Sequence, residues 1–239
     1  MRMKNKRYLL LLLMVLPSMG LLRAQDDTQL SQYWAMPSYY NAGAAGIYEK
    51  LNLRAATRQQ WVGMPGAPKS FLALADMPLR FLKADHGVGL MLANDSYGLF
   101  KTTSLGLQYA YKVRLWGGQL SLGLQLGLVS QTFDGTEVFI PESDYHQQTD
   151  NAIPTTELQG TAFDVGFGMY YTHKYFYAGL SSTHLTQPTI SFDENYEGSI
   201  TRAYYFMAGG NIPLRNALYE VQPSMMVKTT FQMTQAELT

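Results

Sequence analysis

The chain contains no cysteine among its 239 residues. Disulfide bonds are therefore excluded, together with the small secreted folds that depend on a disulfide framework. A lipoprotein signal is excluded as well, because that kind of lipidation requires a cysteine. The absence of cysteine fits an exported protein, although it does not by itself predict export.

Long apolar runs are also missing, apart from one near the start of the chain. That run, residues 8–16, ends at Pro17 and is far shorter than the roughly 20 residues of a membrane-spanning helix. Basic residues precede it, and Leu22-Arg23-Ala24 supplies the small residue of a cleavage site. We predict that residues 1–24 are a signal peptide, cleaved after Ala24. Any membrane contact in the remaining chain must be made by strands.

An excess of positive charge is absent. Lys and Arg number 18, as do Asp and Glu, and five of the basic residues lie in residues 1–24, which hold no acidic residue. Residues 25–239 therefore hold 13 basic and 18 acidic residues, a formal charge of −5. Nucleic acid is excluded as a partner, because phosphate binding requires clustered Lys and Arg. No Ser-rich or Pro-rich linker divides these residues, which predicts one domain.

Metal-binding spacings are missing too. The four histidines, at positions 86, 146, 173 and 184, show no His-x-x-His or His-Glu-x-x-His spacing. Asp144 with His146, and Asp193 with Glu194 and Glu197, offer oxygen ligands for a calcium ion, but solvated outer loops explain them equally well. We predict no metal and no cofactor.

A serine hydrolase is the least favoured of three functions that we consider. Ser181 and Ser182 lie next to His184, but adjacency in sequence is not the geometry of a catalytic triad. Neighbouring strand residues point to opposite faces, and no orienting acid lies close by in sequence. We therefore predict that the protein is not an enzyme.

Alternation is the strongest pattern that the sequence does contain. In residues 120–131, leucine occupies every second position as far as Leu128, and Ser121, Gly123 and Gln125 lie between the leucines. A period of two is typical of a strand and sends all five leucines to one face. The opposite face is too small and polar to form a packed core. Residues 104–113 repeat the pattern, and Gly117-Gly118 between the two stretches predicts a tight hairpin turn with positive φ angles.

Both stretches have the length of strands that cross a bilayer, about 9 to 11 residues, against about 5 to 6 for a soluble strand. Weaker candidates bring the predicted total to nine strands: residues 51–60, 69–78, 87–94, 162–171, 175–182, 201–210 and 218–231.

The predicted connections alternate in length, and aromatic residues collect near strand ends, as in outer-membrane barrels. Short turns are predicted at residues 116–118, 172–174 and 211–216, and long polar loops at residues 133–161 and 183–200. We predict an all-β fold, an antiparallel transmembrane β-barrel of the outer-membrane type. The alternative is a soluble β-sandwich, which would pack its aromatic residues in the core. The aromatic groups are residues 109, 111 and 116, residues 170, 171 and 175–177, and residues 204–206.

One stretch is more specific than alternation can explain. Residues 58–69, which read Arg-Gln-Gln-Trp-Val-Gly-Met-Pro-Gly-Ala-Pro-Lys and are followed by Asp76 and Pro78, resemble the first hairpin of the PorP/SprF family. Gln32-Tyr33 and residues 41–46 resemble that family's opening signature, with Ala42 and Gly43 in place of the usual proline and alanine. Later motifs follow in the same order: residues 94–98 resemble the family's Asp-x-x-Gly turn, residues 184–188 its His-x-x-Gln-Pro turn, and Pro223-Ser224 with Lys228 a late strand. The family-motif or partner-contact candidates are Tyr33, Asn41, Gly46, Arg58, Gln60, Trp61, Pro65, Pro68, Asp76, Asp95, Gly98, His184, Gln187, Pro188, Pro223, Ser224 and Lys228.

Physical roles can be assigned to the first hairpin as hypotheses. Pro65 and Pro68 should fix a turn together with the neighbouring glycines, and Trp61 should lie at the membrane interface. Arg58 and Gln60 share one face, where they line the lumen or meet a partner. An internal salt bridge between Arg58 and Asp76 is an equally good interpretation.

The resemblance implies a noncatalytic outer-membrane component of the type IX protein secretion system, in some members paired with export of a gliding adhesin. The implied partners are other secretion-system subunits at the periplasmic side and a secreted cargo protein at the outer loops. The alternative function is a diffusion or uptake barrel resembling fatty-acid transporters. A plug in the lumen would distinguish the secretion function from the uptake function. Residues 25–50 are the candidate plug or periplasmic lead-in before a barrel at residues 51–239.

Similar proteins continue through several more strands. Single-chain bacterial barrels also have an even number of strands, which nine does not satisfy. We therefore expect a barrel that is truncated at its C-terminus.

Overall fold

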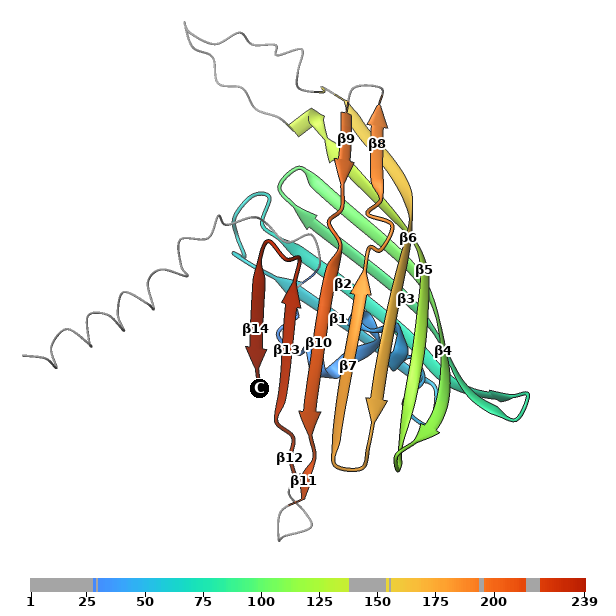
Figure 1. Cartoon of the computed structure of the whole chain (residues 1–239). Helices are drawn as coiled ribbons and strands as arrows, with labels where there is room; N and C mark the ends of the chain where they lie inside the picture. Colours follow the sequence, from blue (N-terminus) through green and yellow to red (C-terminus); the bar gives the residue numbers. More distant parts are fainter. Residues whose placement is uncertain (1–27, 29, 138–153, 155, 194–195, 214–219) are drawn as a thin grey trace, which may run out of the picture.

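The main element of the protein is one antiparallel sheet of ten strands, in the order β1-β2-β3-β4-β5-β6-β7-β10-β13-β14. The computed structural model describes residue 28, residues 30–137, residue 154 and residues 156–193, 196–213 and 220–239; the predicted signal peptide lies outside them. The sheet curls around residues 30–47 (Figure 1). Its strands are β1 (Asn52–Gln59), β2 (Lys69–Phe81), β3 (Ala84–Tyr97), β4 (Phe100–Leu115), β5 (Gly118–Asp134), β6 (Glu157–Thr172), β7 (Phe176–Thr183), β10 (Ala203–Gly210), β13 (Ser224–Thr229) and β14 (Thr234–Leu238).

Smaller elements complete the described part of the chain. Two short hairpins stand at opposite ends of the sheet (Figure 1): β8 (Thr189–Asp193) with β9 (Tyr196–Ser199), and β11 (Ile212–Pro213) with β12 (Glu220–Val221). The helical turns are η2 (Tyr33–Ala35), α2 (Pro37–Tyr40), η3 (Ala42–Ala44) and η4 (Gly135–Glu137). None of the helices in the described residues is long and apolar enough to cross a membrane.

The predicted all-β antiparallel class is confirmed, but the predicted number of strands is wrong. The main sheet has ten strands, because β14 continues it beyond residue 231. Among the described residues, β1 and β14 each have one neighbour in the sheet, so the sheet is not closed into a barrel. The predicted strand at residues 218–231 is divided into β12 and β13 around Pro223, since proline cannot donate to a strand ladder.

The two faces of the sheet differ as the alternation predicts. Cross-strand pairing sets Leu128 of β5 opposite Leu105 of β4 and Phe163 of β6. From Leu122 to Leu128 the leucines of β5 are 38% to 50% exposed, whereas Ser121 and Gln125 are 2% and 6% exposed. The leucines therefore lie on the convex outer face, and the small and polar residues face the interior. A soluble sandwich would bury the leucines beneath a second sheet, so this alternative is wrong.

The hairpin between β4 and β5 is tight, but its turn differs in detail from the prediction. Positive φ angles occur at Trp116 (50°) and Gly117 (76°), and Gly118 pairs with Leu115 as the first residue of β5. The turn therefore uses Trp116-Gly117, where two positive φ angles match the twist of the flanking strands.

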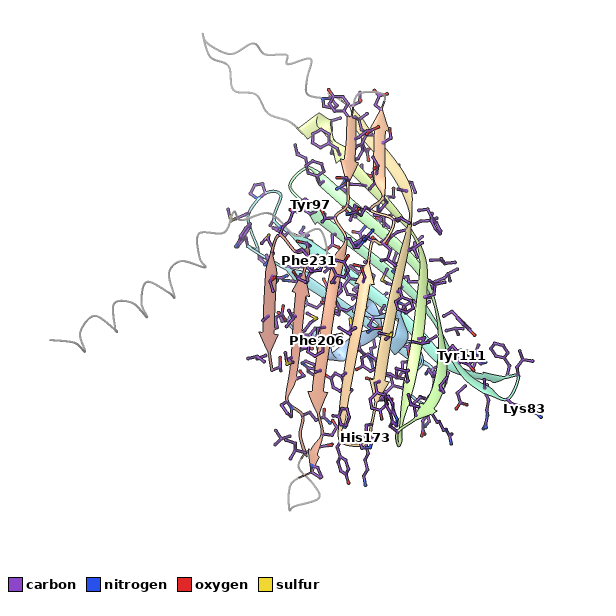
Figure 2. All side chains as sticks on the ribbon, viewed as in Figure 1. Lys83, Tyr97, Tyr111, His173, Phe206 and Phe231 are labelled. Carbon is purple, nitrogen blue, oxygen red and sulfur yellow. The ribbon has the colours of Figure 1, made fainter. Side chains whose placement is uncertain are left out.

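The connections differ at the two ends of the sheet. Lys83 and His173 mark the end where turns of two or three residues join β2 to β3, β4 to β5 and β6 to β7. Tyr97 and Phe231 lie toward the other end (Figure 2), which has the two-residue turn between β3 and β4 but also the long connections β5–β6 and β7–β10. The connection after β10 was predicted to be a short turn at residues 211–216. It instead extends over residues 211–223 and contains β11 and β12, and residues 214–219 lie outside the description. The predicted long loop at residues 183–200 contains the hairpin β8–β9. The polar composition of these residues did not indicate a strand pair.

Residues 30–47, called the inner segment below, lie against the concave face of the sheet (Figure 1). Its apolar side chains form the main buried cluster together with inward residues of β2, β3, β10 and β13. The cluster includes Leu30, Tyr33, Met36 and Tyr40 from the inner segment and Leu72, Leu74, Met91, Tyr205, Met207 and Met226 from the sheet. Burial of these side chains stabilises the inner segment by roughly 1.5 to 3 kcal/mol for each large one. Tyr170 and Tyr205 are buried inside, so they do not belong to an outer aromatic belt as predicted.

Candidate functional site

The candidate site is the contact between the inner segment and the surrounding wall. Local sequence determines the compact course of this segment. Pro37 occupies the first turn of α2, where its missing N–H and fixed φ are favourable. Asn41 then caps η3, because its Oδ1 accepts a hydrogen bond from the Gly43 N–H at 2.9 Å.

Asn41 also joins the inner segment to two strands. Its Nδ2 donates to the carbonyl oxygens of Met169 at 2.9 Å and Leu180 at 3.2 Å, and these two residues pair across β6 and β7. A Cβ on Gly168 would lie 2.1 Å from the Asn41 Oδ1. The glycine therefore provides the space that this amide occupies.

Gly46 is held at both of its backbone polar groups. Its N–H donates to Asp76 Oδ1 on β2 at 2.9 Å, and its carbonyl oxygen accepts from Lys112 Nζ on β4. Its φ of +64° favours glycine, and a Cβ would lie 2.6 Å from the Met77 carbonyl oxygen. Position 46 can therefore hold only glycine without displacing the wall.

Further contacts connect the inner segment to both margins of the sheet. The Tyr33 hydroxyl lies 2.9 Å from Ser224 Oγ on β13, and Arg54 on β1 donates to the Ala35 carbonyl oxygen. Between these margins, Ser181 Oγ donates to the Tyr40 carbonyl at 2.6 Å. Residues 33–35 therefore bridge the two sides of the opening between β1 and β14.

Glycines in the wall allow the backbone of the inner segment to approach the strands closely. A Cβ on Gly123 would lie 2.1 Å from the Gly43 nitrogen, and one on Gly87 would lie 2.0 Å from the Ala45 carbonyl oxygen. Beside them, Gln108 Nε2 donates to the Ser38 carbonyl at 2.7 Å and to Gln125 Oε1 at 2.8 Å. The small and polar inner face seen in the sequence is thus the surface that receives the inner segment.

Comparison with known proteins identifies the family. A model of the family described as type IX secretion system membrane protein PorP/SprF matches residues 22–239. The chain belongs to the PorP/SprF family. No match was found among curated proteins or among solved structures.

The structure brings several predicted motif residues of this PorP/SprF chain together. Tyr33 contacts Ser224, and Gly46 contacts Asp76, so motifs far apart in sequence meet at the inner segment. Lys228 is also buried in the interior, with its Nζ 5.6 Å from the centre of the Tyr205 ring. None of these pairings follows from the sequence, because alternation gives the face of a residue but not its partner.

The first hairpin of this PorP/SprF chain lies apart from the inner segment contacts. Trp61 and Pro65 are exposed in the turn between β1 and β2, Gln60 and Pro68 are half-buried, and Arg58 lines an inner cavity. The predicted Arg58–Asp76 salt bridge is wrong. The register pairs Arg58 with Ser70 and Asp76 with Asn52, which places the two residues about 20 Å apart along the strands.

Two of the remaining motifs form turns at the same end as the first hairpin. Gly98 has φ +56° between β3 and β4, and its N–H donates to the Gly66 carbonyl at 2.9 Å. In the turn after β7, the Gln187 N–H donates to the His184 carbonyl at 2.9 Å, and Pro188 is buried. Both predicted turns are confirmed. Asp95 accepts a hydrogen bond from Thr28, and Pro223 is exposed directly before β13.

The serines near His184 do not form a triad with it. His184 Nδ1 lies 2.9 Å from Asp164 Oδ2, while Ser181 donates to Tyr40. Ser182 pairs with Phe167 across β6 and β7 and shares the outer face with it. Among the residues that the structure describes, no group of three His, Cys, Asp or Glu could hold a metal ion; Asp144, His146 and Glu194 lie outside those residues.

Sequence reasoning missed three wall residues that hold the inner segment. The alternation of residues 104–113 places Gln108 and Lys112 on the polar face, but the groups that they bind in the inner segment are backbone carbonyls, which carry no sequence signal. Arg54 stacks over Tyr48 at 4.4 Å from the ring centre and contacts Ala35. Inward-facing charged or amide side chains in an alternating strand are the signal that would have found them.

Two cavities lie on either side of the inner segment in this PorP/SprF chain. One, of about 630 Å³, lies toward the β8–β9 end and is lined by residues that include Asp95, Phe100, Phe133 and Glu197. The other, of about 1240 Å³, lies toward the short-turn end and includes Arg54, Arg58 and Tyr177 in its lining. The inner segment therefore divides the interior.

Proposed function

We propose that this protein is a noncatalytic outer-membrane component of the type IX secretion system, with a lipid-facing wall and a plugged interior. The exposed apolar outer face is the observation that carries the proposal. Leucine, phenylalanine and tyrosine side chains cover the outside of β3 to β7, including Leu107, Leu126, Phe167 and Leu180. Soluble monomers rarely expose contiguous apolar patches larger than a few hundred Å². In a bilayer these side chains would contact lipid, so their exposure to water would be avoided.

The proposed orientation follows from the connections. Outer-membrane barrels combine short periplasmic turns with longer outer loops. The end that carries Leu82-Lys83 and Trp116-Gly117 would then face the periplasm, and the β8–β9 end would face the outside. We propose that other secretion-system subunits bind the periplasmic end and that a cargo, such as a gliding adhesin, meets the outer end.

Both free edges of the sheet would need partners in the membrane. Every unpaired backbone group that faces hydrocarbon costs several kcal/mol. In the described residues, β1 and β14 each pair on one side only. We therefore propose a closed barrel in the bilayer, completed by contact between the edges or by strands that pair with them.

The alternative, a diffusion or uptake barrel, requires a path through the interior. The inner segment occupies that path with buried, hydrogen-bonded residues, among them Tyr33, Tyr40 and Asn41. This arrangement favours a partner-binding role over free diffusion. It supports the interpretation of residues 25–50 as a plug.

The experiment is a pull-down of the tagged full-length gene product from crosslinked outer membranes, with heat-dependent gel migration as the prior check for a barrel. Recovery of type IX secretion subunits, and loss of cargo export when the gene is deleted, supports the proposal. Small-solute conductance in lipid bilayers without recovery of those subunits would support the diffusion barrel and overturn it.

A further inference from the structure

The cavity of about 630 Å³ has a wall unlike the rest of the interior. Around the inner segment the inward side chains of β4 and β5 are mostly small or polar, whereas toward the β8–β9 end of the same strands they become aromatic. The strand register places Tyr97, Phe100 and Phe133 on the inner face at the ends of β3, β4 and β5. Their rings form a row, with centroids 5.9 Å apart for Tyr97–Phe100 and 5.1 Å apart for Phe100–Phe133. Phe192 and Tyr196 of β8 and β9 contribute further rings to the lining.

Carboxylates dominate the charge of this cavity, and the His184 ring in its lining has its Nδ1 2.9 Å from Asp164 Oδ2. Asp95 and Glu197 belong to its lining, and among the described lining residues there is no Lys or Arg. Thr28 donates a hydrogen bond to Asp95, so this carboxylate is held in place beside the rings. Thr102, Ser104 and Gln131 add polar groups to the same wall.

We propose that this cavity binds an organic cation with an apolar body, of the alkylammonium or arylammonium class. Ring faces attract a cation through their quadrupole, and the attraction is strongest where water is excluded. Asp95 and Glu197 supply the compensating charge, and the apolar rings receive the hydrocarbon body. A cavity of this volume falls in the range of small-molecule sites, about 300 to 1,000 Å³.

The same charges exclude the ligand class that the uptake alternative predicts. A fatty-acid anion would bring its carboxylate toward Asp95 and Glu197, with no lysine or arginine in the described lining to receive it. Like charges in a partly desolvated site disfavour binding. The site is therefore selective for the sign of the ligand charge, not for hydrophobicity alone.

The experiment is calorimetric titration of the full-length protein in a nonionic detergent, with empty micelles as the blank. The probes are benzyltrimethylammonium, the neutral alcohol 2-methyl-1-phenylpropan-2-ol, which has a similar shape, and laurate. The expected result is saturable binding of the cation, about tenfold tighter than that of the alcohol. Equal affinity for the cation and the alcohol, stronger binding of laurate, or no saturable binding of the cation overturns the proposal.

Substitutions in the cavity lining, each with a control outside it, test whether the cation binds in this cavity. The double variant Asp95→Asn, Glu197→Gln should weaken cation binding about tenfold and leave the alcohol unaffected, while Asp193→Asn, outside the cavity lining, should change neither. Phe100→Leu should weaken cation binding about threefold, whereas Phe163→Leu, on the outer face, is its matched control. Unchanged cation binding in both cavity variants contradicts the proposal. If the double variant fails to fold, the proposal is decided by cation binding to Phe100→Leu and by the ratio of cation affinity to alcohol affinity in the natural protein.

Discussion

Asp76 and Lys112 hold opposite polar groups of the same residue, Gly46. Asp76 on β2 accepts from the Gly46 N–H, Lys112 on β4 donates to the Gly46 carbonyl, and β3 separates the two strands. Both side chains are buried, at 3% and 6% exposure. Two buried charges of opposite sign thus fix where the inner segment leaves the interior toward β1.

Lys112→Met should destabilise the protein by about 2 kcal/mol or more, because it leaves the Gly46 carbonyl without its donor and removes one of the two cations near Asp76, the other being Arg54. Asp76→Asn should have a smaller effect, since the amide oxygen can still accept from the Gly46 N–H. Denaturant unfolding of the lipid-embedded protein measures both. Equal effects of the two variants would contradict this expectation, because they would show that the loss of charge alone, without the hydrogen bond to Gly46, accounts for the destabilisation.

Gly46→Ala should destabilise the protein by more than the roughly 1 to 2 kcal/mol that a left-handed residue costs, because the new methyl group would also meet the Met77 carbonyl. Gly63→Ala is the matched control. Gly63 also has a positive φ, but a Cβ there has no atom within 4 Å. The two unfolding midpoints should differ clearly, and similar midpoints would contradict the close packing at position 46.

Tyr33→Phe and Ser224→Ala should each lower the free energy of unfolding by about 1 kcal/mol, since each removes one partner of a buried hydrogen bond. The double variant should lose much less than the sum of the two losses, because the same bond is removed twice. A double-mutant cycle in denaturant tests this contact between the inner segment and β13. Additive losses would mean that the two hydroxyl groups do not interact.

The sequence predicted the faces of the strands well and the number of strands poorly. The alternation around Leu124 and Gln125 follows directly from the pleat of a strand, so it could be read without a structure. Strand β14 is five residues long and mostly polar, and the hairpin β8–β9 is similar in composition, so neither carries an apolar signal. The positions of Asn41 and Gly46 could be singled out only by resemblance. Their partners, main-chain carbonyls and an inward lysine, depend on three-dimensional packing that no local pattern encodes.

Gly168→Ala should release the inner segment from the wall. A methyl group there would lie 2.1 Å from the Asn41 Oδ1, so the amide must leave the Met169 and Leu180 carbonyls. Limited proteolysis should then cleave within residues 30–47 at a protease concentration that leaves the natural protein intact. Gly210→Ala is the control, because a Cβ there would be 3.6 Å from its nearest neighbour, the Tyr175 carbonyl oxygen. Resistance to cleavage in Gly168→Ala would argue against Asn41 as an anchor.

Leu126→Lys tests whether the convex face of the sheet meets lipid. Leu126 lies in the middle of β5, paired with Leu107 and Val165 on the outer face. A lysine near the bilayer midplane costs about 2 to 4 kcal/mol in a barrel wall, so we expect poor membrane insertion and a lower unfolding midpoint in lipid. Leu82→Lys makes the same chemical change at a residue that is 88% exposed in the β2–β3 turn, and it should be nearly neutral. On a water-facing surface both substitutions would be neutral, because Leu126 is already 46% exposed. A Leu126→Lys protein that inserts and unfolds like the Leu82→Lys control would therefore refute the lipid-facing wall, and the proposed place of this chain in the outer membrane with it.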